Sequence, residues 1–279
     1  MSRLVPVADG VRLRVLHWPG GHPTFLLVHG LASNALLWGE VARVLSAKGH
    51  EVFAVDLRGH GESDVPDSGY DTETAAADLA ALADELGLTG LVVVGQSWGG
   101  NVVVRLAAKR PDLVAAVALV DGGWIDLSRE FASWEECAAA LRPPELDGHG
   151  ADDMRDLLRG AHPGWSAEAI EATLANLRIR PDGNLERRLP IARHMEIVHS
   201  MWDDPPSPDY PRVTARVLLV PAVPTTDAAR ARRKRDASAA AAAAIAGPST
   251  IREYVGGDHD LHAQRPEALA ADLLALAAT

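Results

Sequence analysis

One stretch of the chain, residues 91–110, joins a strand-like apolar run directly to a helix-like run and puts a single serine between them. It reads LVVVGQSWGGNVVVRLAAKR, with Gly95 two residues before Ser97 and Gly99 two residues after it. A chain that passes from strand to helix this abruptly needs a strained turn, where bulk on either side of the serine would collide with the strand or the helix. The glycines therefore predict a turn that exposes the Ser97 hydroxyl at the start of a helix whose first backbone N–H groups are free. The plainer alternative is a serine that only caps the helix.

Short β-branched runs alternate with helix-like segments along most of the chain, which is typical of a mostly parallel sheet covered by helices on both faces. The pattern predicts about eight strands, near residues 3–7, 11–18, 24–30, 51–57, 91–96, 113–122, 216–222 and 250–255. The first two are expected to form an antiparallel hairpin across Asp9-Gly10. Helices are expected near 34–48, 72–86 and 98–110, followed late in the chain by an Ala-rich helix and by a last helix that starts at Pro266.

Between Gly123 and Pro211 the strand pattern stops, and the chain becomes helix-like and rich in tryptophan. It leaves this region through DDPPSPDYP, where each proline fixes φ and stops helix propagation. We therefore predict a core made of residues 1–123 and 212–279, with a helical cap inserted at 124–211. Most cap tryptophans are expected to fill the cap's own core. Trp124 and, in the first half of the chain, Trp38 are predicted to contact substrate.

Composition restricts the class of partner. The 279 residues carry a net charge of −11, which repels nucleic acid and anionic membrane surfaces. The basic run RARRKRD at 230–236 is either a recognition patch or, as we expect, the solvated face of the Ala-rich helix. A single cysteine, Cys137, excludes an internal disulfide framework and fits a reducing compartment. Without an apolar run typical of a signal peptide or a membrane span, we expect a cytoplasmic monomer or homodimer that acts on a small molecule.

Four segments resemble the α/β-hydrolase family: LLVHGLASNALLW, DLRGHGESD, the turn GQSWGG and GGDHDLHAQRPEALA. The resemblance covers nearly the whole chain and implies an α/β-hydrolase fold in which Ser97 is the nucleophile. It also implies an oxyanion hole built from the backbone N–H groups of Leu31 and Trp98. Loop-organising roles are implied for four polar residues: His29, Asp56, Arg58 and His60.

A serine hydroxyl needs a base within hydrogen-bond reach. The resemblance places that base in GGDHDLH, where we favour His259 over His262. The acid is left open between Asp121, in ALVDGGW at a strand end, and Asp227, which follows LLVPAVPTT and equally suits a helix cap; we favour Asp121. A metal site formed by His259 and His262 with Asp258 and Asp260 is the alternative, but no second cluster of ligand residues supports it. The serine mechanism needs neither a metal nor a cofactor.

A serine nucleophile disfavours the dehalogenases and epoxide hydrolases of the family, which use aspartate. The sequence therefore predicts hydrolysis of a small or medium apolar ester, lactone or thioester through an acyl-enzyme on Ser97. Carbon–carbon bond hydrolysis, perhydrolysis and acyl transfer stay open because the same triad serves them. The alternative outside the enzymes is a non-catalytic ligand sensor on the same fold. A broken triad or a broken serine turn would indicate such a sensor, and the sequence shows neither.

Overall fold

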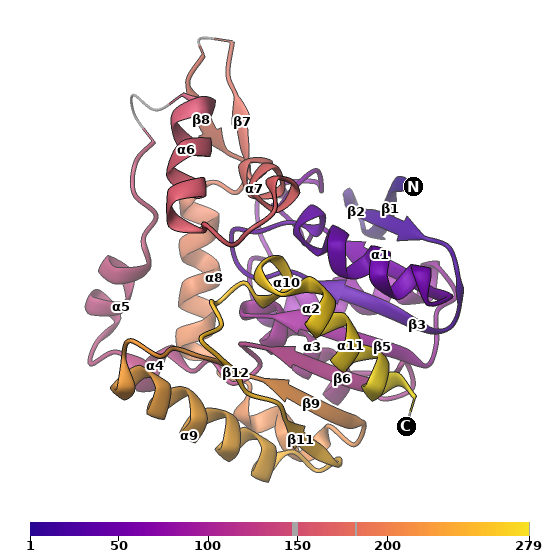
Figure 1. Ribbon diagram of the computed structural model, residues 1–279. Coiled ribbons are helices and arrows are strands. Elements are labelled where there is room, and N and C mark those ends of the chain that lie inside the picture. Colours follow the sequence, from indigo (N-terminus) through magenta and orange to yellow (C-terminus); the bar gives the residue numbers. More distant parts are fainter. Residues whose placement is uncertain (147–149, 182, 279) are drawn as a thin grey trace.

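The computed structural model describes residues 1–146, 150–181 and 183–278, and its centre is an eight-stranded sheet (Figure 1). Its strands are β1 (Ser2–Ala8), β2 (Val11–Trp18), β3 (Gly21–Val28), β4 (His50–Val55), β5 (Leu91–Gln96), β6 (Val114–Val120), β9 (Arg216–Val220) and β11 (Ser249–Ile251). They lie in the order β1-β2-β4-β3-β5-β6-β9-β11. The pairs β1–β2 and β2–β4 are antiparallel, and the other neighbouring pairs are parallel. These are the eight strands predicted from sequence, so the predicted α/β class with a mostly parallel sheet is confirmed.

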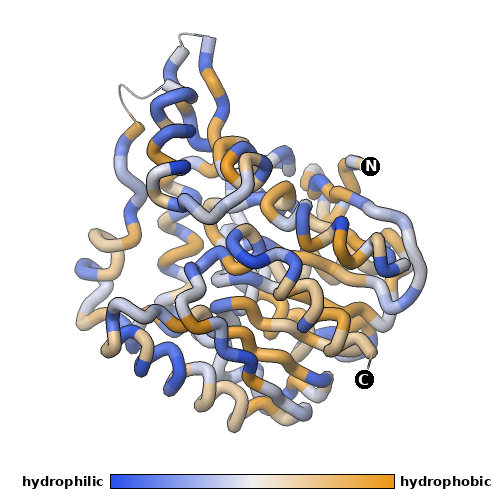
Figure 2. The backbone as a smooth tube through the Cα atoms, in the orientation of Figure 1, coloured by the Kyte–Doolittle hydropathy of each residue, from blue (hydrophilic) through white to orange (hydrophobic). Residues whose placement is uncertain are grey.

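The strands read as apolar runs because the sheet is covered on both sides. All six residues of β5 are buried. Successive residues of β3 point to opposite faces, with Leu26 and Val28 in one hydrophobic cluster and Phe25 and Leu27 in the other. Figure 2 shows the same arrangement as hydrophobic colour concentrated along the central strands.

Helices form the two outer layers (Figure 1). One face carries the 3-10 turn η1 (Ala35–Trp38), α1 (Gly39–Ala47), α10 (Leu261–Gln264) and α11 (Pro266–Ala277). The other face carries α2 (Thr72–Glu85), α3 (Trp98–Lys109) and α9 (Ala228–Ala244). Pro266 is the first residue of α11, as the sequence predicted. After β9, the strand β10 (Ala222–Val223) pairs in parallel with β12 (Tyr254–Val255) and forms a separate two-stranded sheet.

The segment predicted as a cap, 124–211, supplies most of the remaining helices. They are α4 (Leu127–Glu130), α5 (Trp134–Leu141), α6 (Ala151–Ala161), α7 (Ala167–Leu174), α8 (Ile191–Asp203) and the 3-10 turn η2 (Ser207–Arg212). The segment also contains an antiparallel hairpin of β7 (Leu177–Ile179) and β8 (Leu185–Arg187), which the sequence did not predict because strands of three residues are too short to show an alternating pattern. In Figure 1 this hairpin and α6 stand well away from the sheet. The domain boundaries remain a prediction, and residues 147–149, 182 and 279 of the predicted domains lie outside the described residues.

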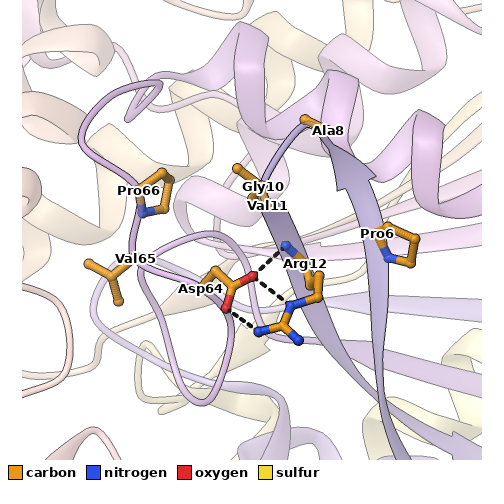
Figure 3. Close-up of a pocket in the computed structure, with 8 residues that line it drawn as sticks. All are labelled: Pro6, Ala8, Gly10, Val11, Arg12, Asp64, Val65 and Pro66. Carbon is orange, nitrogen blue, oxygen red and sulfur yellow. Dashed lines mark hydrogen bonds and ion pairs between the residues drawn. The ribbon is translucent and has the colours of Figure 1, made fainter.

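A groove of about 640 Å³ runs along the first hairpin, between β1, β2 and residues 64–66 (Figure 3). Arg12 and Asp64 point toward each other in it and pair twice, with Nε 2.9 Å from Oδ2 and Nη2 3.0 Å from Oδ1. An arginine whose charge is already matched by a bidentate carboxylate has little left for an anionic ligand. The groove contains none of the site residues predicted from the sequence. In the part of the chain that the structure describes, no helix is both long and apolar enough to cross a membrane.

Candidate active site

The turn between β5 and α3 has the tight geometry that its glycines predicted. The φ of Ser97 is 53°, in the left-handed region that side-chain-bearing residues rarely adopt. A Cβ on Gly95 would lie 2.2 Å from the carbonyl oxygen of Gly99, and a Cβ on Gly99 would lie 2.4 Å from that of His29. Both positions therefore exclude a side chain. Ser97 stands at the N-cap of α3 but makes no side-chain capping hydrogen bond, so its hydroxyl is not spent on the helix.

The structure brings Asp121 and His259 together from positions 138 residues apart, with Nδ1 of the histidine 2.6 Å from Oδ2 of the aspartate. Asp121 follows β6, and its second oxygen accepts the backbone N–H of Ala222 at 3.0 Å. Gln96, the residue before Ser97, donates from Nε2 to the backbone carbonyl of His259 at 3.2 Å. The hydrogen-bonded pair is thereby held beside the serine turn.

The two ends of the Asp121–His259 pair face different surroundings. The Asp121 side chain is 1% exposed and that of His259 is 44% exposed. In the described part of the chain, His259 Nε2 and the Ser97 hydroxyl have no hydrogen-bond partner, either in each other or elsewhere. Catalytic hydrogen bonds are often long in unliganded enzymes and shorten when substrate binds. The histidine nitrogen that is turned away from Asp121 is thus available for proton transfer.

Charge fixes the protonation pattern of the pair. Desolvation lowers the pKa of His259, but the hydrogen bond to Asp121 and the negative charges of Asp260 and Asp121 outweigh it, so the pKa is raised above its ordinary value. Desolvation raises the pKa of Asp121, but the hydrogen bond and charge of His259, together with the charge of Lys234, leave it lowered. Asp121 is therefore ionised at neutral pH, and His259 Nδ1 carries the proton that they share.

Lys234 is a site residue that the sequence reasoning missed. Its Nζ donates to Oδ2 of Asp121, the same oxygen that His259 contacts, and its side chain is 19% exposed. It belongs to the basic run 230–236, which we expected to be a solvated helix face. The tertiary arrangement brings Lys234 to Asp121: β6 pairs with β9, with Val120 opposite Val220, and α9 follows β9. This arrangement has no local signal in the sequence.

Asp227, the alternative acid, does not lie at His259. Its side chain accepts the backbone N–H of Arg230 at 2.9 Å and caps the start of α9. This is the helix-capping role that the sequence left open for it.

The backbone N–H groups of Leu31 and Trp98 have no acceptor among the described residues. Gly30, just before Leu31, packs so closely on the serine turn that a Cβ on it would lie 2.8 Å from the Cβ of Ser97. The indole Nε1 of Trp98 donates to Oγ1 of Thr72 at 3.1 Å. Trp98 therefore offers the site its backbone N–H and not its ring.

His29 and His60 lie close to this loop, but both are occupied. Burial lowers the pKa of His29 to about 4 and that of His60 to about 3, so both rings are neutral. Nε2 of His29 accepts the backbone N–H of Leu57 at 3.0 Å, and Nε2 of His60 accepts that of Ala32 at 3.2 Å. The nitrogens that a base would use are bonded to backbone donors, which supports loop-organising roles for these residues.

Asp56 and Arg58 also serve the loops. Asp56 accepts the backbone N–H of Ala35 at 2.7 Å, and Arg58 makes two hydrogen bonds of 2.7 Å to Asp78. These contacts fix the loops after β3 and β4 and engage both side chains within those loops and α2.

Trp38 lies in the core, although the sequence suggested a substrate contact. It is fully buried, and its ring centroid is 4.4 Å from that of His262, which is also fully buried. The reason is that η1 turns Trp38 against α10, so it offers no surface to a substrate. Trp124, which follows the Asp121 loop, is partly buried against the core, and its contact with substrate remains a prediction.

Among the described residues, no group of three or more His, Cys, Asp or Glu side chains is placed to hold a metal ion. Asp258, one of the residues weighed for such a site, instead has one oxygen 3.1 Å from Nε1 of Trp165 and 3.2 Å from Nδ1 of His162. Its other oxygen accepts the backbone N–H of Asp260 at 2.7 Å. Asp258 thus links the loop that carries His259 to the segment predicted as a cap.

Comparison with known proteins bears on the same elements. The model of the alpha/beta hydrolase fold family matches residues 23–144, which include the turn at Ser97 and the Asp121 loop. An esterase of Mycobacterium tuberculosis is 32% identical over 196 residues, covering 69% of this chain and 65% of the relative. The 2-(acetamidomethylene)succinate hydrolase of Mesorhizobium japonicum is 30% identical over 207 residues, covering 72% of this chain and 70% of the relative.

A solved structure of E-2-(acetamidomethylene)succinate hydrolase superimposes with a TM-score of 0.78, covering 100% of this chain and 99% of that one at 26% identity. The agreement thus extends over the whole chain and includes the insertion after β6. From its sheet order, its strained serine turn and these relatives, the chain belongs to the α/β-hydrolase fold family.

Proposed function

We propose that this protein is a serine hydrolase that cleaves a small carboxylic ester, lactone or thioester through an acyl-enzyme on Ser97. The observation that carries the proposal is the hydrogen bond between buried Asp121 and His259, held beside an unpaired serine hydroxyl by the Gln96 side chain. Nucleophile, base and orienting acid are the three parts that acyl transfer by serine requires. The esterase and hydrolase relatives support this class of reaction.

The proposed reaction starts with the Ser97 hydroxyl. His259 Nε2 accepts its proton while the oxygen attacks the substrate carbonyl, and ionised Asp121 stabilises the imidazolium that forms. The backbone N–H groups of Leu31 and Trp98 donate to the oxyanion. As the tetrahedral intermediate collapses, His259 gives its proton to the leaving group. Water then attacks the acyl-enzyme with the same proton transfers, releasing the acid and restoring the Ser97 hydroxyl.

The raised pKa of His259 gives this mechanism a direction with pH. The ring accepts the serine proton only when it is neutral, so the acylation rate should rise as pH increases through the pKa of His259. Because that pKa is raised, the midpoint should lie above about 6.5, the ordinary value for histidine.

Turnover of p-nitrophenyl butyrate by the purified protein tests the proposal. Ser97→Ala should reduce kcat by about 10³-fold or more, because it removes the nucleophile of a coupled triad. Ser128→Ala is a matched control, since Ser128 is exposed on the short helix α4 and its hydroxyl donates to the neighbouring Asp126. Equal turnover by Ser97→Ala and wild type, or no turnover by any of the three proteins, would rule the proposal out.

A further inference from the structure

A second cavity, of about 70 Å³, lies where the loop after β3 meets the β7–β8 hairpin and α8. The loop contributes Ala32 and Ser33 to its wall, and the facing segments contribute Arg187, Arg188 and His194. Ser33 is three residues beyond Gly30, which packs on Ser97. Three residues span at most about 10 Å, so the Ser33 wall of the cavity lies within about that distance of the loop position that packs on Ser97.

The two arginines in this cavity have no carboxylate partner among the described residues. Arg187 donates from Nη2 to the backbone carbonyl of Pro144. Arg188 donates to two more carbonyls, of Ala175 at 2.9 Å and Gly61 at 3.2 Å. Burial lowers the pKa of Arg187, and the negative charge of Glu145 offsets this effect only in part. Arg187 is therefore a partly desolvated cation that no carboxylate of the described residues pairs with.

Three other arginines of the chain are arranged differently. In the groove of Figure 3 the guanidinium of Arg12 is matched by both oxygens of Asp64. Arg43 and Arg58 are likewise matched, by Glu168 and Asp78. A partly buried cation without a counter-charge costs free energy. That cost is offset when a ligand supplies the missing negative charge.

Two further groups in the cavity, Ser33 and His194, affect which ligand it suits. The Ser33 hydroxyl is buried and has no hydrogen-bond partner in the described part of the chain. A buried hydroxyl without a partner is costly unless a ligand or water completes it. Nε2 of His194 lies 3.1 Å from the Leu141 carbonyl, and burial lowers the pKa of His194, so that ring adds no positive charge to those of the two arginines.

We propose that this cavity binds a carboxylate carried by the substrate, with the guanidinium of Arg187, which pairs with no carboxylate of the described residues, and the hydroxyl of Ser33 as its donors. A planar guanidinium fork suits the two oxygens of a carboxylate. One water needs about 10–15 Å³ of such space, so about 70 Å³ accommodates a carboxylate with a short carbon link but not a long acyl chain. This inference rests on the proposed function and narrows its substrate to an ester that carries a carboxylate, in place of the apolar substrate predicted from the sequence.

The test compares two p-nitrophenyl esters of equal acyl length, the butyrate and the hemisuccinate, which differ in a terminal carboxylate. The measured quantity is the ratio of kcat/KM for the hemisuccinate to kcat/KM for the butyrate. Arg187→Met should lower this ratio about 10-fold or more, the loss expected for a charge-assisted hydrogen bond. Arg187→Lys, which keeps the charge but loses the fork, should fall between Arg187→Met and wild type.

The matched control is Arg178→Met, on the neighbouring strand β7, where Arg178 is exposed and pairs with Glu186. It should leave the ratio as in wild type. A wild type that shows no preference for the hemisuccinate would overturn the inference. So would an Arg187→Met ratio equal to that of wild type or of Arg178→Met.

A binding measurement separates this inference from the proposed function. Titration calorimetry of monomethyl succinate into the Ser97→Ala protein should show binding that Arg187→Met abolishes in the same background. If neither ester is turned over but this binding is present, the hydrolase proposal fails and the carboxylate site stands. If esters are turned over at Ser97 but monomethyl succinate does not bind, the carboxylate site fails and the hydrolase stands.

Discussion

Asp121→Asn is expected to remove most of the activity while leaving the fold in place. Oδ1 of Asp121 accepts the Ala222 N–H, and Oδ2 receives His259 and Lys234. An asparagine amide must present its NH₂ group to one of these sides, and both sides hold donors. The amide therefore cannot hold His259 in the tautomer that leaves Nε2 free to accept a proton, a defect that lowers kcat by on the order of 10⁴-fold. This loss equals about 5 kcal/mol of transition-state stabilisation.

The same substitution leaves Lys234, which is 19% exposed, without its counter-charge. Removing one partner of a fully buried ion pair costs about 3–5 kcal/mol, and partial exposure of Lys234 reduces the expected loss of unfolding free energy to about 1–3 kcal/mol. The double variant Asp121→Asn/Lys234→Met should recover most of that stability but none of the activity. Urea denaturation followed by circular dichroism, with kcat measured on the same preparations, separates the two effects.

Asp227→Ala is the matched control for the triad acid. Its side chain caps α9, so its loss should cost about 0.5–2 kcal/mol of stability and leave kcat close to that of wild type. The reasoning is refuted if Asp227→Ala loses as much kcat as Asp121→Asn, or if Asp121→Asn keeps a tenth or more of wild-type kcat.

Three further outcomes follow from single contacts. The positive charge of Lys234 lowers the pKa of His259, so Lys234→Met should move the rising limb of the pH profile of kcat/KM to higher pH. Lys234→Arg keeps the charge and should leave the limb near its wild-type position. A limb that does not move in Lys234→Met contradicts this prediction. Gly99→Ala places a Cβ 2.4 Å from a backbone carbonyl oxygen and should lower the free energy of unfolding, measured by urea denaturation, by about 1–3 kcal/mol. Gly160 has open space around it on α6, so Gly160→Ala should raise the free energy of unfolding slightly. Cys137 is fully buried and burial raises its pKa, so a disulfide-exchange reagent should react with one thiol per chain in urea and only slowly in the native protein.

The sheet and the serine turn could be predicted because their information is local. An alternating or continuous apolar run identifies a strand, and two glycines spaced around Ser97 identify the turn, without knowledge of distant residues. The β7–β8 hairpin could not be found in this way, since each strand has only three residues.

Contacts between distant segments were the harder part. Lys234 meets Asp121 across 113 residues, and its run of basic neighbours looks the same as any solvated helix face. For Trp38 the predicted substrate contact was wrong. A large aromatic residue beside a functional loop suits a substrate contact and a core position equally, and the turn η1 places Trp38 in the core. Arg187 and Arg188 are informative only once the structure shows that no carboxylate among the described residues reaches them.

The most direct test of the central claim, that Ser97 is a nucleophile activated by His259, is labelling with a fluorophosphonate probe. Intact mass and peptide mapping should find one probe per chain, on Ser97, with a labelling rate that rises with pH through the pKa of His259. Ser97→Ala should take up none, and His259→Ala should label far more slowly. A probe found on another residue, or Ser97 labelled equally fast without His259, would contradict the account.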